Sequence, residues 1–403
     1  MRKKFVFITI ILLAAVFLSG CTGAVAWPGL SASGDVAYLA NTNTVYAIDA
    51  KSGKQLWKFS GESSGGIFSF GKSPNMYITN PVVTEDGLVI ILDSSSKHIM
   101  YALDPNDIDL EKQTPSIKWK FSAVHGLWIA PPLVIGDRLF APNSDGNVYV
   151  LDLTDGKSEK QAIETITVSE SSKEEARLWS QPVTDGERLF VTSLDKSVIA
   201  IDLETYDVLW REDLGGAVPG GAALGSDGML YVGSLAKQLE RFDPATGAHE
   251  PVLDTKGWIW GTPVANGDNL YFGDVEGYVY SYNTAKGALN WEAQPDAVIT
   301  ASPLVYGDQI LVATESGGVY SFNTDGDFEE WYKPATKGKA YTTPVIAGDF
   351  ALVAYLESDY YLVALDTESE SVEPYVRKVE ECLLQNPDYA ECWGNWIAEL
   401  IER

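Results

Sequence analysis

The chain has 403 residues, a length that would suggest two or three domains. All-β chains, however, often form a single domain that is longer than the usual domain size. It contains 56 acidic and 29 basic side chains, a formal net charge of −27. This excess of negative charge argues against a nucleic-acid partner, whose phosphates require a basic surface, and against adsorption to anionic lipid headgroups. It names no partner, because strong acidity is also a general means of keeping a protein soluble.

Residues 1–20 have the features of an export signal. Arg2, Lys3 and Lys4 precede an apolar or small-residue run over 5–18, which is shorter than the ~20 residues of a bilayer-spanning helix. The run ends at Leu-Ser-Gly-Cys21, which resembles a bacterial lipobox, so Cys21 is the predicted lipid attachment site. An ordinary secretory signal with a chance cysteine is the alternative. Cleavage would leave 26 basic and 56 acidic residues, and we expect the chain to be extracytoplasmic and lipid-anchored to the cell membrane or outer membrane.

One unit of about 40 to 55 residues recurs eight times over residues 21–371. An Asp or Asn that closes a predicted third strand recurs at Asp49, Asp104, Asp152, Asp202, Asp243, Asn283, Asn323 and Asp366. A proline opens each unit, at Pro28, Pro81, Pro131 or Pro132, Pro182, Pro219, Pro263, Pro303 and Pro344. Each unit holds β-rich runs and Gly/Asp turns enough for four strands, which can bury both faces only between neighbouring sheets. The pattern predicts an all-β, eight-bladed β-propeller.

Two sets of aromatic residues recur within the units. The tryptophans at the predicted outer strand are expected to pack between blades as structural residues: Trp57, Trp119, Trp210, Trp291 and Trp331. A second set lies just before the opening proline and could form an exposed binding face: Trp128, Trp179, Trp258, Trp260 and Tyr341. Burial between blades is the alternative for any one member of this second set.

Residues 372–403 depart from the repeat. The eighth unit lacks its tryptophan strand, so its blade is expected to be short or to be completed by the N-terminal segment. From Pro374 the apolar spacing becomes helical, and Asn386-Pro387 is a typical helix start, which predicts a short C-terminal helical hairpin. Cys382 and Cys392 flank the predicted turn and are a candidate disulfide in an oxidising compartment, with two free thiols as the alternative.

The segment Val-Tyr-Ala-Ile-Asp-Ala-Lys-Ser-Gly-Lys-Gln-Leu-Trp at 45–57 resembles the repeat of PQQ-binding-like β-propellers, and the resemblance extends over about residues 27–367. It implies the PQQ-like propeller fold, but the family includes both quinoprotein dehydrogenases and non-catalytic members. Among the latter, lipoprotein subunits of outer-membrane β-barrel assembly are similar in length, in the eight-repeat layout and in the lipobox.

The residues that would support catalysis are sparse. Many quinoprotein dehydrogenases carry adjacent cysteines beside the cofactor, whereas the three cysteines here are Cys21, Cys382 and Cys392. The histidines, His98, His125 and His249, show no zinc-site spacing. We therefore expect no catalytic residue, no metal and no cofactor; PQQ with calcium would be needed only for the alternative of a PQQ-dependent oxidoreductase.

The sequence thus predicts a non-catalytic cell-envelope scaffold, similar to an outer-membrane β-barrel assembly factor. It is expected to bind envelope proteins, to reach the membrane through its lipid anchor, and to be a monomeric propeller within a complex. A propeller that binds glycans or small ligands is a further alternative.

Overall fold

The computed structural model describes residues 27–62, 75–122, 125–157, 163–164, 178–334, 338–356, 361–367 and 372–373. In these ranges the regular structure consists of strands, arranged in eight four-stranded antiparallel sheets, which confirms the predicted eight-bladed propeller. The described part of the chain has no helix long and apolar enough to span a membrane. The predicted signal segment 1–20, Cys21 and the predicted helical hairpin after residue 373 lie outside the described residues.

The first four blades follow the chain in order. The first contains β1 (Gly29–Ser33), β2 (Val36–Asn41), β3 (Thr44–Asp49) and β4 (Gln55–Phe59). The second contains β5 (Val82–Val83), β6 (Val89–Leu92), β7 (Ile99–Asp109) and β8 (Thr114–Ser122). The third contains β9 (Leu133–Ile135), β10 (Arg138–Pro142), β11 (Asn147–Asp152) and β12 (Ile163–Glu164). The fourth contains β13 (Val183–Thr184), β14 (Arg188–Thr192), β15 (Ser197–Asp202) and β16 (Val208–Asp213).

The remaining four blades repeat this plan. The fifth contains β17 (Ala222–Leu224), β18 (Leu230–Gly233), β19 (Gln238–Phe242) and β20 (His249–Asp254). The sixth contains β21 (Val264–Asn266), β22 (Asn269–Gly273), β23 (Val279–Asn283) and β24 (Ala288–Ala293). The seventh contains β25 (Leu304–Tyr306), β26 (Gln309–Ala313), β27 (Val319–Phe322) and β28 (Phe328–Tyr332). The eighth contains β29 (Val345–Ala347), β30 (Phe350–Ala354), β31 (Leu362–Asp366) and β32 (Val372–Glu373).

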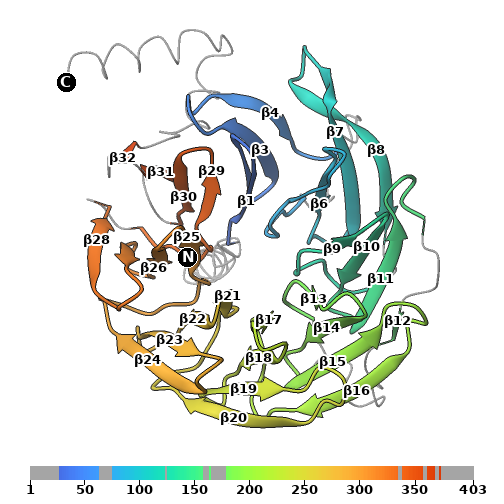
Figure 1. Ribbon diagram of the computed structural model, residues 1–403. Helices are drawn as coiled ribbons and strands as arrows, with labels where there is room; N and C mark the ends of the chain where they lie inside the picture. The colour runs from blue at the N-terminus through green and yellow to red at the C-terminus, as the bar shows by residue number, and fades with distance from the viewer. Residues whose placement is uncertain are drawn as a thin grey trace, which may run out of the picture.

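The blades are arranged around a central axis, with the first strand of each blade near the axis and the fourth at the rim (Figure 1). The eighth blade takes all four of its strands from residues 345–373, so the N-terminal segment does not complete it. Its outer strand β32 has only two residues, as expected for a short blade. The second blade also differs from the sequence pattern, because β7 continues past Asp104 and Asp109 pairs with Thr114.

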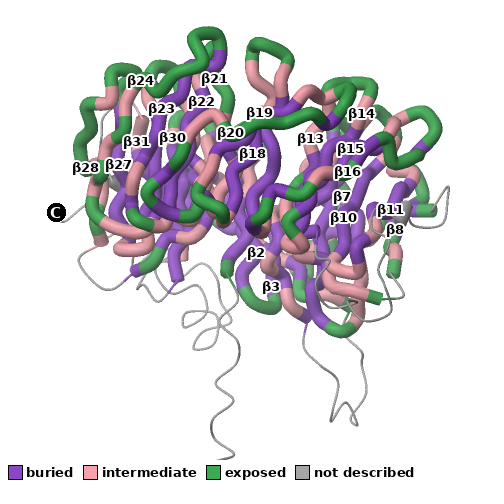
Figure 2. Tube along the Cα trace, turned by 90° about the horizontal axis from the view of Figure 1, so that it is seen from below, coloured by how far each residue is buried: buried purple, intermediate pink, exposed green. Residues whose placement is uncertain are grey.

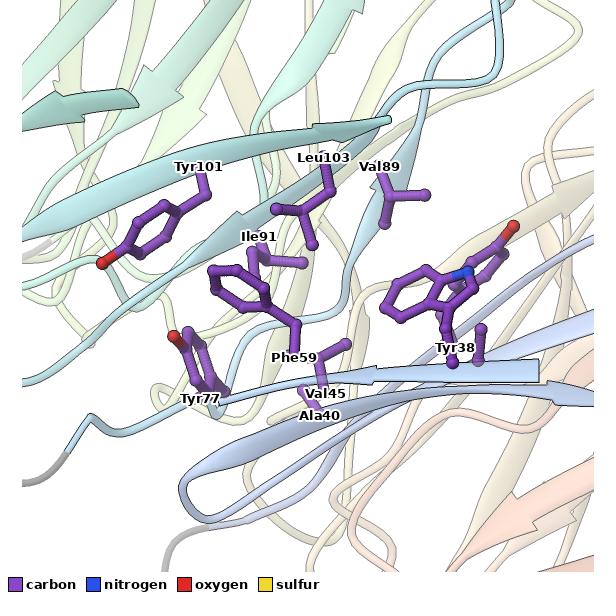
Figure 3. Close-up of a cluster of buried hydrophobic side chains, with 11 residues drawn as sticks. Tyr38, Ala40, Val45, Phe59, Tyr77, Val89, Ile91, Tyr101 and Leu103 are labelled. Atoms are coloured by element: carbon purple, nitrogen blue, oxygen red, sulfur yellow. The ribbon is translucent and has the colours of Figure 1, made fainter. Parts of the chain in front are cut away.

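The hydrophobic core is divided into eight clusters, each between two adjacent blades. Between the first and second blades, Phe59 lies against Tyr101 with ring centroids 5.1 Å apart, and Tyr77 covers its other side (Figure 3). The second and third strands are therefore buried on both faces, whereas the turns at the two ends of the propeller are exposed (Figure 2). Continuous apolar runs such as residues 45–48 follow from this packing.

The ring is closed by packing between the first and last blades. Leu30, Leu39 and Ile48 of the first blade form one buried cluster with Leu352 and Leu362 of the eighth. A backbone hydrogen bond, in which Gly348 N donates to Gly34 O at 3.0 Å, joins the turns of these two blades. Closure therefore depends on side-chain burial more than on a strand shared between the chain ends.

In most repeats the recurring Asp or Asn organises the turn that follows the third strand. The Asp202 carboxylate accepts hydrogen bonds from the backbone N–H groups of Thr205 and Glu204, which lower the pKa of this carboxyl group. Asp243 accepts the equivalent hydrogen bonds from Ala245 and Thr246. Such side-chain-to-backbone bonds stabilise tight turns, which accounts for the recurrence of this residue type.

The rim tryptophans lie between blades. Trp119 donates its Nε1–H to Leu153 O of the next blade at 2.6 Å, and Trp210 does the same to Pro244 O at 2.9 Å. Trp291 repeats the contact with Thr324 O at 2.9 Å. Trp57 is 2% exposed in the cluster between the first and second blades, and Trp331 packs against the cluster between the seventh and eighth.

We predict that Gly156→Ala strongly destabilises the propeller. Gly156 has a φ of +69°, and a Cβ atom there would lie 2.5 Å from the Trp119 ring. The left-handed backbone should cost about 1–2 kcal/mol, and displacement of the tryptophan about 1–3 kcal/mol more. Gly228→Ala is the control, because φ is +75° there but no atom lies within 4 Å of the added Cβ. Equal losses of unfolding free energy in urea for the two variants would contradict the role of the Trp119 contact.

Candidate binding site at one end of the propeller

The two ends of the propeller are built from different connections. Because the strands of each blade alternate in direction, every first strand begins at the same end, which we call the proline end after the prolines that precede these strands. The turns between second and third strands lie at this end too, as shown by the hydrogen bond from Val275 N to Trp258 O at 3.0 Å. The turns between first and second strands and between third and fourth strands form the opposite end, which we call the aspartate end.

Four aromatic side chains meet at the proline end. Trp27 stacks on Tyr341 with ring centroids 5.2 Å apart and an interplanar angle of 7°. Trp260 meets Trp27 edge-on at 6.4 Å and Trp179 at the same distance. These residues precede the first strands of the first, eighth, sixth and fourth blades. Because non-adjacent blades can touch only near the axis, this axial aromatic cluster (Trp27, Trp179, Trp260 and Tyr341) covers the centre of the proline end.

A chain of hydroxyl groups holds the connections that carry this cluster. Gly221 N donates to Thr262 Oγ1 at 2.7 Å, Thr262 N to Ser302 Oγ at 2.9 Å, and Ser302 N to Thr343 Oγ1 at 3.2 Å. A Cβ atom on Gly220 would lie 2.6 Å from Gly261 O, so the neighbouring connections are in close contact. Partly buried networks of backbone-to-hydroxyl hydrogen bonds restrain the backbone around them. The aromatic cluster is therefore supported by a rigid base.

The sequence pattern missed these hydroxyl residues and Trp27. The recurring signal was a Ser or Thr directly before the opening proline, at Thr262, Ser302 and Thr343. Trp179, Trp260 and Tyr341 each precede their proline by three residues, whereas Trp27 directly precedes Pro28. Because of this different spacing, the pattern did not identify Trp27.

The predicted binding residues differ in exposure. Trp258 is 47% exposed and Trp27 is 39% exposed, whereas Trp179, Trp260 and Tyr341 are half-buried. The prediction of an exposed face is wrong for Trp128, which is fully buried between the second and third blades. Its ring lies 5.3 Å from Tyr149, and its Nε1–H donates to His98 O at 3.0 Å. The other four predicted residues are on the proline end, where Trp179, Trp260 and Tyr341 belong to the axial aromatic cluster and Trp258 lies in the same connection as Trp260.

The two ends also differ in charge. Every turn between a first and a second strand contains an aspartate, and none contains Lys or Arg. These aspartates are Asp35, Asp86, Asp137, Asp185, Asp227, Asp268, Asp308 and Asp349. The third-to-fourth-strand turns at the same end contain both acidic and basic residues.

The proline end has a mixed charge. In the described connections between blades, Lys256, Lys333 and Lys339 accompany Glu62 and Asp296. The second-to-third-strand turns add both signs, namely Lys97, Lys196 and Lys237 with Asp93, Asp145, Asp195, Asp274, Glu276 and Glu315. Of these carboxylates, Asp93 and Asp274 are fully buried. The aspartate end is therefore the more acidic surface of the described propeller.

One ion pair near the seventh blade illustrates the balance at the proline end. Lys333 Nζ lies 2.9 Å from Asp296 Oδ2, and Ser316 donates a hydrogen bond to the same oxygen. Partial burial opposes ionisation of Asp296, but the hydrogen bonds from Ser316 and Lys333 outweigh it and lower the pKa of the carboxyl group. Asp296 is thus held as an ionised carboxylate whose charge is balanced by Lys333.

The described residues contain no group of three or more His, Cys, Asp or Glu side chains that could hold a metal ion. The absence of catalysis and of a cofactor stays a prediction. The predicted lipid attachment at Cys21 and the candidate disulfide between Cys382 and Cys392 fall outside the described residues.

The sequence matches the family described as outer membrane protein assembly factor BamB over residues 22–250 and 252–373. One similar protein is the outer membrane protein assembly factor BamB of Pseudomonas aeruginosa, 32% identical over 121 residues. The matched segment spans 30% of this chain and 30% of that relative's length.

Solved structures share the fold. The crystal structure of BamB from Moraxella catarrhalis has a TM-score of 0.62 and 18% identity, covering 81% of this chain and 92% of that one. The computationally designed Ika8 protein has the same TM-score at 12% identity, covering 82% of this chain and 94% of its own. The match that spans nearly all eight blades shows that the chain belongs to the outer membrane protein assembly factor BamB family.

Proposed function

We propose that this protein is a non-catalytic scaffold of the cell envelope that takes part in the assembly of outer membrane proteins. The family match supports this role because it covers residues 22–250 and 252–373, the whole of the repeated sequence. In this proposal Cys21 is the lipid attachment site, the propeller is extracytoplasmic, and it acts as one subunit among envelope proteins.

The observation that carries the proposal is the aromatic surface at the proline end. Trp258 is 47% exposed at this end, two residues before Trp260 of the axial aromatic cluster, and a hydroxyl network holds the surrounding connections. Exposed aromatic side chains on a rigid base are typical of protein-binding surfaces, where tryptophan often contributes most of the binding energy. We propose this end as the binding surface.

The test is in-cell crosslinking of the tagged, lipidated protein, followed by purification and mass spectrometry. We expect β-barrel assembly components to be recovered with the wild type. Trp258→Ala should lower their recovery by about tenfold or more, equivalent to about 1.4 kcal/mol. Leu289→Ala is the matched control, since Leu289 is 36% exposed on the rim of the same blade and should leave recovery unchanged.

Other outcomes would favour the other candidates. Recovery of no protein partner would contradict the scaffold role. Retention on peptidoglycan or polysaccharide, reduced by Trp258→Ala, would indicate a glycan-binding propeller instead. Absorbance of bound PQQ in the purified protein would indicate the quinoprotein alternative.

A further inference from the structure

The described chain begins next to the axis of the propeller, at the proline end. Trp27, the first described residue, stacks on Tyr341 and contacts Trp260, which belong to the eighth and sixth blades. These contacts hold the start of the propeller near the centre of that end instead of at its rim. Any tether that precedes Trp27 is therefore joined to the propeller at the middle of the aromatic surface.

The tether to the proposed lipid anchor is short. Trp27 follows Cys21 by six positions, and six residues span at most about 20 Å when fully extended. A lipid on Cys21 would therefore hold the centre of the proline end within that distance of the bilayer surface. Because Trp27 lies near the axis, this whole end can lie parallel to the membrane.

The chemistry of the two ends favours the same orientation. Trp27 and Trp258 are 39% and 47% exposed at the proline end, and tryptophan is enriched at the membrane–water interface because its ring is apolar and its N–H is polar. The aspartate end carries an acidic residue in every first-to-second-strand turn and would be repelled by anionic lipid. Mixed charge at the proline end reduces this repulsion.

We propose that the proline end rests on the bilayer surface, with Trp27 and Trp258 in the lipid headgroup layer and the aspartate end facing away from the membrane. The inference depends on the lipid anchor in the proposed function, and it names the lipid headgroup layer as the contact of Trp27 and Trp258. In the anchored protein Trp258 then contacts lipid and aligns the propeller, while a protein partner binds the rest of the proline end. Trp258→Ala would therefore lower partner recovery by disturbing this alignment.

The test uses the full-length lipidated protein reconstituted into phosphatidylcholine vesicles whose acyl chains are brominated near the carbonyl end. Bromine quenches only tryptophans close to the lipid, so wild-type fluorescence should be lower than in unbrominated vesicles. The double variant Trp27→Phe/Trp258→Phe should lose most of this quenching. Trp291→Phe is the control, because Trp291 lies at the rim and donates to Thr324 O of the next blade, and its removal should not reduce the quenching.

A second variant tests the tether without altering the surface. A 20-residue Gly-Ser insertion between Ala26 and Trp27 produces a flexible tether of about 25–30 Å root-mean-square length, which can extend much further. Quenching should fall while the protein stays in the vesicle fraction. The same insertion after Arg403 should leave quenching unchanged.

The possible failures are distinguishable. If the protein is anchored but its tryptophans are not quenched, the membrane-facing orientation is overturned and the scaffold role is left intact. Crosslinks from position 258 to protein alone would have the same meaning. An intact mass that shows no acyl group on Cys21 overturns both the anchor and the orientation. Failure to recover assembly components, with normal quenching, overturns only the scaffold role.

Discussion

Replacement of Cys21 by Ser is expected to transfer the protein from the membrane fraction to the soluble fraction. Each buried methylene of an acyl chain contributes about 0.8 kcal/mol to membrane binding, so the anchor would be the dominant attachment. Without it, the strong negative charge of the chain disfavours binding to anionic lipid. Fractionation followed by immunoblotting measures the change.

Cys382→Ser is the control for this experiment. Cys382 lies near the other end of the sequence and outside the predicted lipobox, so its replacement should leave the protein in the membrane fraction. If Cys21→Ser sediments with membranes as the wild type does, the residue is not the attachment site. A wild-type protein that is already in the soluble fraction would instead favour the alternative of an ordinary secretory signal with a chance cysteine.

Trp128→Ala should destabilise the folded protein by about 3–5 kcal/mol, the range for removal of a large buried aromatic side chain. Trp128 is 0% exposed, lies among Phe121, Tyr149 and other residues between the second and third blades, and donates a hydrogen bond to His98 O. Its removal would leave a cavity at an interface that two blades share. Urea unfolding followed by fluorescence measures the loss.

Trp258→Ala is the matched control, because it removes the same side chain from the equivalent connection of another blade. With 47% of Trp258 exposed, this substitution should cost less than about 1 kcal/mol. The two variants should therefore impair different properties: Trp128→Ala would reduce stability, and Trp258→Ala would reduce binding. Similar unfolding free energies for both would contradict the assignment of Trp128 to the core.

The repeat in the sequence was sufficient to predict the architecture. Prolines and strand-closing Asp or Asn residues at nearly regular spacing identified eight units, and each unit forms a four-stranded blade. Such residues act locally, since proline restricts its own φ and Asp202 bonds to backbone groups two and three positions ahead. Local effects repeat whenever the residues repeat, so they can be read without knowledge of the neighbouring blades.

The extent of individual strands was less predictable. Asp104 has the sequence context of a strand-closing residue, yet β7 resumes pairing after an irregularity and continues to Asp109. The extension also contacts the first blade, where Lys58 N donates to Gln113 O at 2.9 Å. A pairing between residues 55 positions apart leaves no signal in the local pattern.

The sequence by itself therefore determined the number of blades, the turns and the recurring aromatic positions. Only the tertiary structure decided which aromatic residues are exposed, because exposure depends on what packs against each side chain: Trp128 is enclosed between the second and third blades, whereas Trp258 is 47% exposed. It also brought Trp27 against Trp260, although 233 positions separate them, because closure of the ring places the first and sixth blades on opposite sides of one axis. Burial is a property of the whole packed ring, and so the candidate binding surface emerged only when the blades were assembled.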